Sequence, residues 1–155
     1  MSVLAAIRPD DWNLALFVHV LGALALVGAL ATAAAYLFAA RRDGSLALMR
    51  AGYGALLIGA LPAFLVTRIA AQWAASKEGV LDSEATWIVA GFVSTDIGFV
   101  FLVAATVAAG LAVRRAGAEE TSGELGRSVS IAAWLVGLLI VVYAVMIWMM
   151  TAKPG

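Results

Sequence analysis

The chain alternates between long apolar stretches and short polar connections. The apolar stretches cover about residues 12–40, 51–75, 85–113 and 128–152. A helix needs about 20 apolar residues to cross the roughly 30 Å hydrocarbon core of a bilayer, because its backbone polar groups must all be bonded within the segment. The pattern therefore predicts an all-α fold, with four transmembrane helices in an antiparallel up-down bundle. We expect residues 1–155 to form a single integral membrane domain.

The amino-acid composition also indicates that the lipid bilayer surrounds most of this chain. It is 64% hydrophobic and 13% charged, whereas soluble domains are about 45–50% apolar and about 25% charged. Ten basic and ten acidic residues cancel, so no charge excess indicates a nucleic-acid partner. The absence of cysteine excludes disulfides, iron–sulfur clusters and thiolate zinc sites. No phosphate loop or HExxH zinc motif occurs, which argues against kinase and hydrolase functions.

The distribution of basic residues predicts the orientation. Arginines flank the first and third connections at positions 41, 42, 50, 114, 115 and 127, whereas the opposite side holds Arg8, Lys77 and Lys153. Because cytoplasmic loops are enriched in Lys and Arg, the first and third connections are expected in the cytoplasm. The chain is thus predicted to be a multi-pass protein of the inner (plasma) membrane, with its N- and C-termini on the non-cytoplasmic side.

Small residues recur at helical spacing in three of the spans. We expect these rows to be packing seams, since lipid removes most of the hydrophobic drive between helices and close approach replaces it. The rows are Ala25, Ala29 and Ala33; Ala51, Ala55, Gly59 and Ala63; and Ala104, Ala108 and Ala112. Pro62 removes a backbone donor within the second span and predicts a local bend there.

Three ionisable side chains lie inside the spans: His19, Arg68 and Asp96. Counted inward at 1.5 Å per residue from the flanking charges, they lie within about 6 Å of one another in depth, in the outer half of the membrane. Tyr143 reaches the same level, and Gln72 follows Arg68 by one turn on the same face. An Arg68–Asp96 ion pair is expected. The pair either joins the second and third spans as a structural link or, with His19 and Tyr143, lines a pocket that opens outward.

His19 admits two interpretations. A single histidine on an apolar helix can be a hydrogen-bonded structural residue, or it can ligate a metal or haem. Met146 and Met150 on the last span could supply a thioether partner for copper or haem iron, although methionine is also common apolar filler.

Several short motifs carry a resemblance. The segment Leu16–Ala23 (LFVHVLGA) resembles the first helix of several small bacterial membrane families, and Arg68–Trp73 (RIAAQW), Asp96–Gly98 (DIG) and the terminal Lys153-Pro154 resemble a poorly characterised family of bacterial four-helix integral membrane proteins. A more distant similarity, limited to the first helix, is to copper-resistance CopD proteins and HemJ-type protoporphyrinogen oxidases. The HemJ-type resemblance implies haem or porphyrin chemistry, but this chain has one histidine and no lysine within its spans.

These features favour a non-enzymatic role, because no complete catalytic constellation is present and no catalytic residue is assigned. The first hypothesis is a subunit, scaffold or small-ligand-binding module, with a second copy or another membrane protein as partner. The alternative is a haem- or copper-binding redox or transport protein that uses His19. A third is a proton or ion pathway through Asp96, although the cytoplasmic halves carry few polar groups to continue it.

Overall fold

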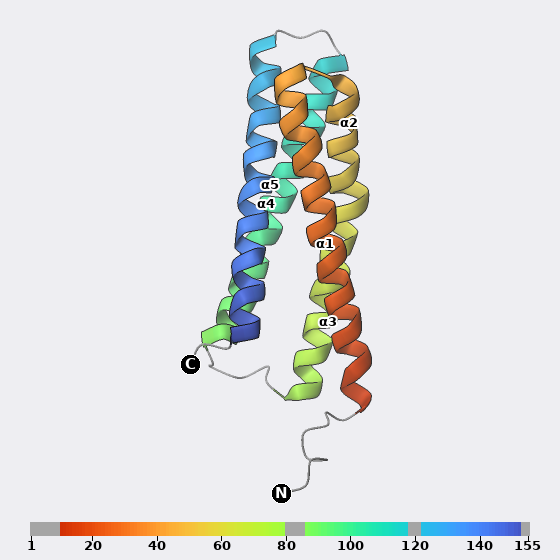
Figure 1. Ribbon diagram of the computed structural model, residues 1–155, viewed down its shortest axis with the longest axis vertical. Helices are drawn as coiled ribbons and strands as arrows, with labels where there is room; N and C mark the ends of the chain where they lie inside the picture. Colours follow the sequence, from red (N-terminus) through yellow and green to blue (C-terminus); the bar gives the residue numbers. More distant parts are fainter. Residues whose placement is uncertain (1–9, 80–85, 118–121, 153–155) are drawn as a thin grey trace, which may run out of the picture.

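The computed structural model describes residues 10–79, 86–117 and 122–152, and the chain is helical throughout almost all of them (Figure 1). The elements are α1 (Asp10–Asp43), α2 (Leu46–Gly54), the π-helical turn η2 (Ala55–Ala60), α3 (Leu61–Glu78), α4 (Thr86–Gly117) and α5 (Ser122–Ala152). Because α2, η2 and α3 are continuous, they form one rod. The described ranges contain four rods and no strand, which confirms the predicted all-α bundle.

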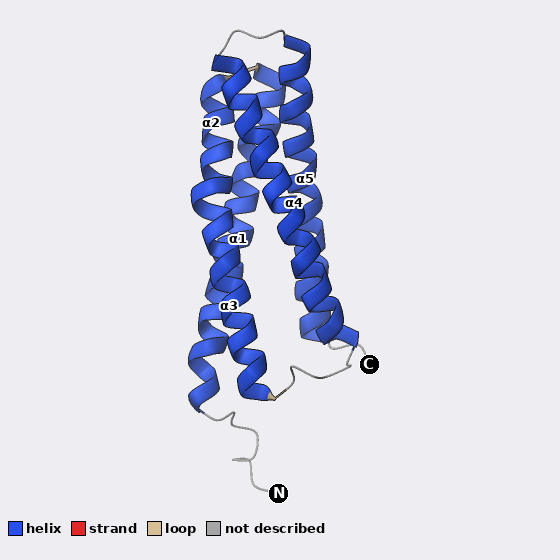
Figure 2. Cartoon of the chain, turned by 180° about the vertical axis from the view of Figure 1, so that it is seen from behind, coloured by secondary structure: helices blue, strands red, loops and turns tan. Residues whose placement is uncertain are grey.

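The four rods form two pairs, which spread apart from each other toward one end of the molecule. We call the end where α1 begins and α5 ends the terminal end, and the opposite end, with Arg41 and Arg114, the arginine end. Figures 1 and 2 show α1 beside α3 and α4 beside α5, with the two pairs diverging toward the terminal end. Accordingly, α3 contacts α4 much less than it contacts α1. The arginine end is held together by contacts of α1 with α5 and of α2 with α4.

The connection between α1 and α2 takes only two residues. Gly44 adopts a positive φ of 65°, and its N–H donates to the carbonyl of Ala40 at 2.9 Å. The next residue, Ser45, caps α2 by accepting the N–H of Leu48 at 3.4 Å. A left-handed glycine ending one helix and a serine beginning the next form a sharp reversal, so the first two spans are antiparallel neighbours.

The helices extend beyond the apolar stretches of the sequence. The predicted third connection, Arg114 to Arg127, is largely helical, because α4 continues to Gly117 and α5 begins at Ser122. Hydropathy marks where hydrocarbon ends, whereas Ala, Arg and Glu continue a helix readily in more polar surroundings. Between the second and third spans, Gly79 ends α3 with a φ of 68°, and residues 80–85 lie outside the described part.

The buried rows lie close to the predicted small-residue seams but do not coincide with them. Ala25 and Ala104 are exposed. The core is formed by Leu26, Leu30, Ala33, Leu37, Leu56, Ala60, Phe64, Leu102, Ala105, Ala109, Ala132, Ala133, Val136 and Leu139. Lipid and protein interior are both apolar, so residue type alone does not distinguish the face toward a neighbouring helix from the face toward lipid.

Pro62 comes just after the π-helical turn η2, which widens the second rod before the proline. The N–H of Leu61 bonds to the carbonyl of Leu56, five residues back rather than four. Proline cannot donate and its ring clashes with the carbonyl four residues earlier, and a wider turn relieves that conflict. One extra residue in a turn rotates the side chains that follow by about 100° around the helix axis. The wide turn therefore determines which face of α3 meets α1.

Candidate functional site

A cavity of about 230 Å³ lies between the two diverging helix pairs, in the half of the molecule toward the terminal end. Its walls are mostly apolar and come from four helices: Leu16 of α1, Ala71, Ala74 and Ala75 of α3, Ile88, Gly91 and Phe92 of α4, and Met150 of α5. Its polar lining residues are His19, Thr67, Arg68, Glu78 and Thr95. An apolar space with a few polar side chains is the usual form of a small-molecule site.

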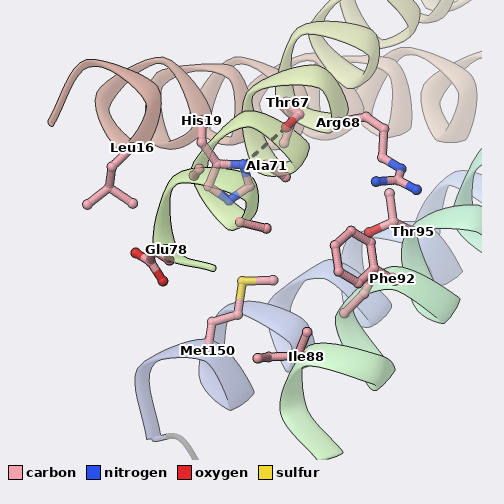
Figure 3. Close-up of a pocket in the computed structure, with 13 residues that line it drawn as sticks. Leu16, His19, Thr67, Arg68, Ala71, Glu78, Ile88, Phe92, Thr95 and Met150 are labelled. Atoms are coloured by element: carbon pink, nitrogen blue, oxygen red, sulfur yellow. Dashed lines mark hydrogen bonds between the residues drawn. The ribbon is translucent and has the colours of Figure 1, made fainter. Parts of the chain in front are cut away.

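The ring of His19 is oriented by a backbone bond across to α3. Its Nδ1 lies 3.1 Å from the carbonyl oxygen of Thr67. A carbonyl can only accept, so Nδ1 carries the proton, and in the neutral imidazole Nε2 is then an acceptor. Figure 3 shows the ring between α1 and α3, with its second nitrogen on the side away from Thr67. His19 thus presents a lone pair to the cavity.

Gly22 allows α1 to come close enough for this bond. A Cβ at Gly22 would lie 2.7 Å from Oγ1 of Thr67 and 3.1 Å from its backbone nitrogen. The two backbones therefore meet with no room for a side chain, as small residues allow in membrane helix pairs. Since Gly22 lies about one turn after His19, the close approach brings the histidine within reach of the Thr67 carbonyl.

Arg68 bridges the two helix pairs where they diverge. Its Nη1 donates to Oε1 of Gln72 at 2.8 Å, and its Nη2 lies 3.4 Å from Oδ1 of Asp96 on α4. The guanidinium also sits 5.0 Å from the centre of the Phe92 ring, a cation–π geometry. Figure 3 shows Arg68 extending from α3 beside Phe92 and Thr95 of α4. It is a direct polar link between α3 and α4.

The five residues of the predicted polar cluster divide into two groups. Arg68, Gln72 and Asp96 are in contact, and Arg68 shares the cavity with His19. The side chain of Asp96 is 69% exposed, and Asp96 is not among the cavity's lining residues. Tyr143 is also absent from the lining, because it packs against Gly98 of α4. The structure therefore does not bring Tyr143 to His19 or Arg68.

The two methionines proposed as metal ligands lie close together, since a Cβ at Gly91 would be 3.3 Å from the methyl carbon of Met150 and 3.8 Å from that of Met146. Met150 lines the cavity, on the α5 wall facing the α1 wall that carries His19 (Figure 3). Met146 is 8% exposed and does not line the cavity. The described residues contain no group of three or more His, Cys, Asp or Glu side chains that could hold a metal. The donors facing this space are thus one imidazole, one thioether and the carboxylate of Glu78.

Among the residues of the site that were not predicted from the sequence, three have distinct roles. Thr67 contributes its backbone carbonyl. Every residue type has this group, so the sequence could not single out position 67. Phe92 lies four residues before Asp96, so helical spacing alone could have placed it beside the Arg68 partner. Glu78 is the last residue of α3. It lines the cavity because the helix pairs diverge there, which the sequence does not reveal.

Fold and composition together define the class of this protein. Within the described residues, four helical segments are long and apolar enough to cross a membrane: Asn13–Asp43, Leu46–Glu78, Ile88–Gly117 and Gly126–Ala152. The chain is a multi-pass membrane protein with lipid as its surroundings. Comparison of the chain with known protein families, curated proteins and solved structures finds no match.

Proposed function

We propose that this protein is a non-enzymatic ligand-binding module of the membrane, and that its cavity takes a small, largely apolar molecule carrying a hydrogen-bond donor. The observation that carries the proposal is the bond from His19 Nδ1 to the Thr67 carbonyl, which leaves Nε2 as an acceptor toward the cavity. A role as a subunit, with a second copy or another membrane protein as partner, stays a prediction.

The polar groups around the cavity favour a donor on the ligand. The hydroxyls of Thr67 and Thr95 donate to carbonyls in their own helices, at 2.7 Å and 2.6 Å. Two nitrogens of Arg68 are engaged by side chains outside the cavity lining. The acceptors that remain are His19 Nε2, the Glu78 carboxylate and the oxygen lone pairs of the two threonine hydroxyls. A hydroxyl or amine on an apolar body matches these acceptors and the apolar walls.

Binding of 1-naphthol tests this proposal, because it combines an apolar body with one hydroxyl donor. In lipid nanodiscs, wild-type protein should bind 1-naphthol about tenfold more tightly than 1-methoxynaphthalene, since one hydrogen bond contributes about 1 kcal/mol or slightly more. His19→Leu should remove that preference. Saturation-transfer NMR against empty nanodiscs measures binding to the protein apart from partition into lipid.

Tyr36→Phe is the matched control, since Tyr36 is an exposed polar residue of the same helix outside the cavity. It should retain the wild-type preference. Equal binding of the two probes by wild type, or an unchanged preference in His19→Leu, would contradict the proposal.

A second candidate is the binding of copper or haem by the same histidine. It is favoured by Met150, which lines the cavity with His19. Imidazole and thioether ligands suit copper(I), and a histidine–methionine pair also serves as axial ligands of haem iron. The Nδ1–H bond to a backbone carbonyl is the usual outer partner of a metal-ligating histidine. When bound, such a group would supply electron-transfer chemistry.

The two candidates are separated by spectroscopy and metal analysis of the same purified samples. Stoichiometric copper or iron, or a Soret band, that is present in wild type and lost in His19→Leu would favour the metal or haem candidate. Metal-free, colourless wild-type protein that still prefers 1-naphthol would favour the ligand-binding module.

We further propose that the protein lies in the plasma (inner) membrane with both termini on the non-cytoplasmic side. The support is the concentration of arginines at the arginine end, which puts the cavity in the outer half of the bilayer. Because the chain has no cysteine, single cysteines can report topology. In intact cells a membrane-impermeant maleimide should label Lys153→Cys and spare Asp43→Cys; the reverse pattern would invert the orientation.

A further inference from the structure

A second concave surface lies between α2–η2–α3 and α4, away from the cavity and toward the arginine end. It is a groove with a volume of about 440 Å³. Tyr53, Leu57 and Leu61 line it from the second rod, and Val103, Val107 and Leu111 line it from α4. Leu57, Val107 and Leu111 are 41%, 55% and 40% exposed, so the groove faces the surroundings of the bundle. In a membrane protein those surroundings are lipid.

The interior of the groove offers little to a polar ligand. Thr106 is buried, and its hydroxyl donates to the carbonyl of Leu102 at 2.8 Å. Gly110 contributes no side chain, and the Tyr53 ring comes within 3.1 Å of where its Cβ would lie. Apart from the hydroxyl of Tyr53, the groove therefore presents hydrocarbon to its occupant along most of its length. Arg114 is the charged residue among those that line it, and it is exposed.

The dimensions match one leaflet of a bilayer. From Val103 to Arg114 the groove follows α4 over eleven residue-to-residue steps, or about 16 Å at 1.5 Å per step. Half of the roughly 30 Å hydrocarbon core is about 15 Å. An occupant with its hydrocarbon along the groove would thus have its polar end at Arg114. A guanidinium binds phosphate with paired hydrogen bonds, and basic pockets between membrane helices favour anionic lipids.

We propose that this groove binds one acyl chain of an anionic phospholipid whose phosphate contacts Arg114. The inference needs the membrane setting and is independent of the cavity and of His19. Two observations support it. The positive charge of Arg114 favours a headgroup with net negative charge, and the apolar length of the groove fits an acyl chain from the same leaflet.

Native mass spectrometry of the full-length protein, released from mild detergent with equimolar palmitoyl-oleoyl phosphatidylglycerol and phosphatidylcholine, tests the site. Wild type should retain phosphatidylglycerol about fivefold over phosphatidylcholine, the effect of about 1 kcal/mol for one basic residue. Arg114→Gln should abolish that preference. Val107→Trp, which fills the groove without changing charge, should lower the retention of both lipids.

Arg42→Gln is the matched control, because Arg42 is an exposed arginine at the same end but not a lining residue of the groove. It should keep the wild-type preference and retention. The site would be refuted if Arg114→Gln kept the preference, if Arg42→Gln lost as much of it, or if Val107→Trp retained both lipids as wild type does. None of these results bears on 1-naphthol binding at His19.

Discussion

Gly22→Ala is expected to destabilise the protein and to disturb the cavity at the same time. The added Cβ would lie 2.7 Å from Oγ1 and 3.3 Å from Cα of Thr67. Because two of the three nearest atoms belong to the backbone, α1 and α3 would have to separate. Overpacking of this kind costs about 1–3 kcal/mol. We expect a lower melting temperature in detergent, measured by circular dichroism.

The same substitution should weaken the bond between His19 and Thr67. His19 is the one histidine of the chain, so ¹⁵N-histidine labelling gives a single imidazole whose tautomer and environment can be followed by NMR. In Gly22→Ala the Nδ1–H tautomer should lose its dominance as the Thr67 carbonyl recedes. A spectrum unchanged from wild type would contradict the role assigned to Gly22.

Gly28→Ala provides the control, since Gly28 lies on the same helix and a Cβ there would meet nothing within 4 Å. Alanine is favoured over glycine within a helix by about 0.5–1 kcal/mol. This variant should melt at the wild-type temperature or slightly above it. If Gly28→Ala were as destabilising as Gly22→Ala, the effect would belong to glycine in α1 generally and not to the contact with Thr67.

Tyr143→Phe is expected to stabilise the protein, and it should also rescue Gly98→Ala. The hydroxyl of Tyr143 is buried and has no hydrogen-bond partner among the described residues. An unsatisfied buried polar group costs about 1–3 kcal/mol, which phenylalanine would recover. The hydroxyl oxygen also lies 2.7 Å from where a Cβ on Gly98 would be. Gly98→Ala alone should therefore be destabilising, by overpacking.

A double-mutant cycle measures the link between these two residues. Without the hydroxyl, the nearest atom of residue 143 is the ring carbon Cζ, 3.3 Å from the new Cβ. Gly98→Ala should cost less in the Tyr143→Phe background, with a coupling energy of about 1–2 kcal/mol, as found for residues in contact. Additive effects, or a destabilising Tyr143→Phe, would indicate that the hydroxyl has a favourable partner and does not limit packing.

The ion pair of the candidate site could be predicted from the sequence on electrostatic grounds. A guanidinium and a carboxylate at similar depth in neighbouring spans are expected to pair, and Arg68 and Asp96 do lie in contact. Depth alone did not place Tyr143 correctly. It was predicted at the level of Arg68, but its hydroxyl lies against Gly98 of α4. A residue's level along a helix follows from counting, whereas its direction around the helix depends on packing.

The sequence by itself determined the four spans and the expected level of each ionisable group. These follow from the thickness of hydrocarbon and from backbone hydrogen bonding within a helix. Tertiary structure alone decided which helix faces are buried, that the helix pairs diverge to leave a cavity, and that His19 meets the Thr67 carbonyl. The reason is that lipid and a neighbouring helix are equally apolar, so only the close fit of backbones, as at Gly22, selects between them.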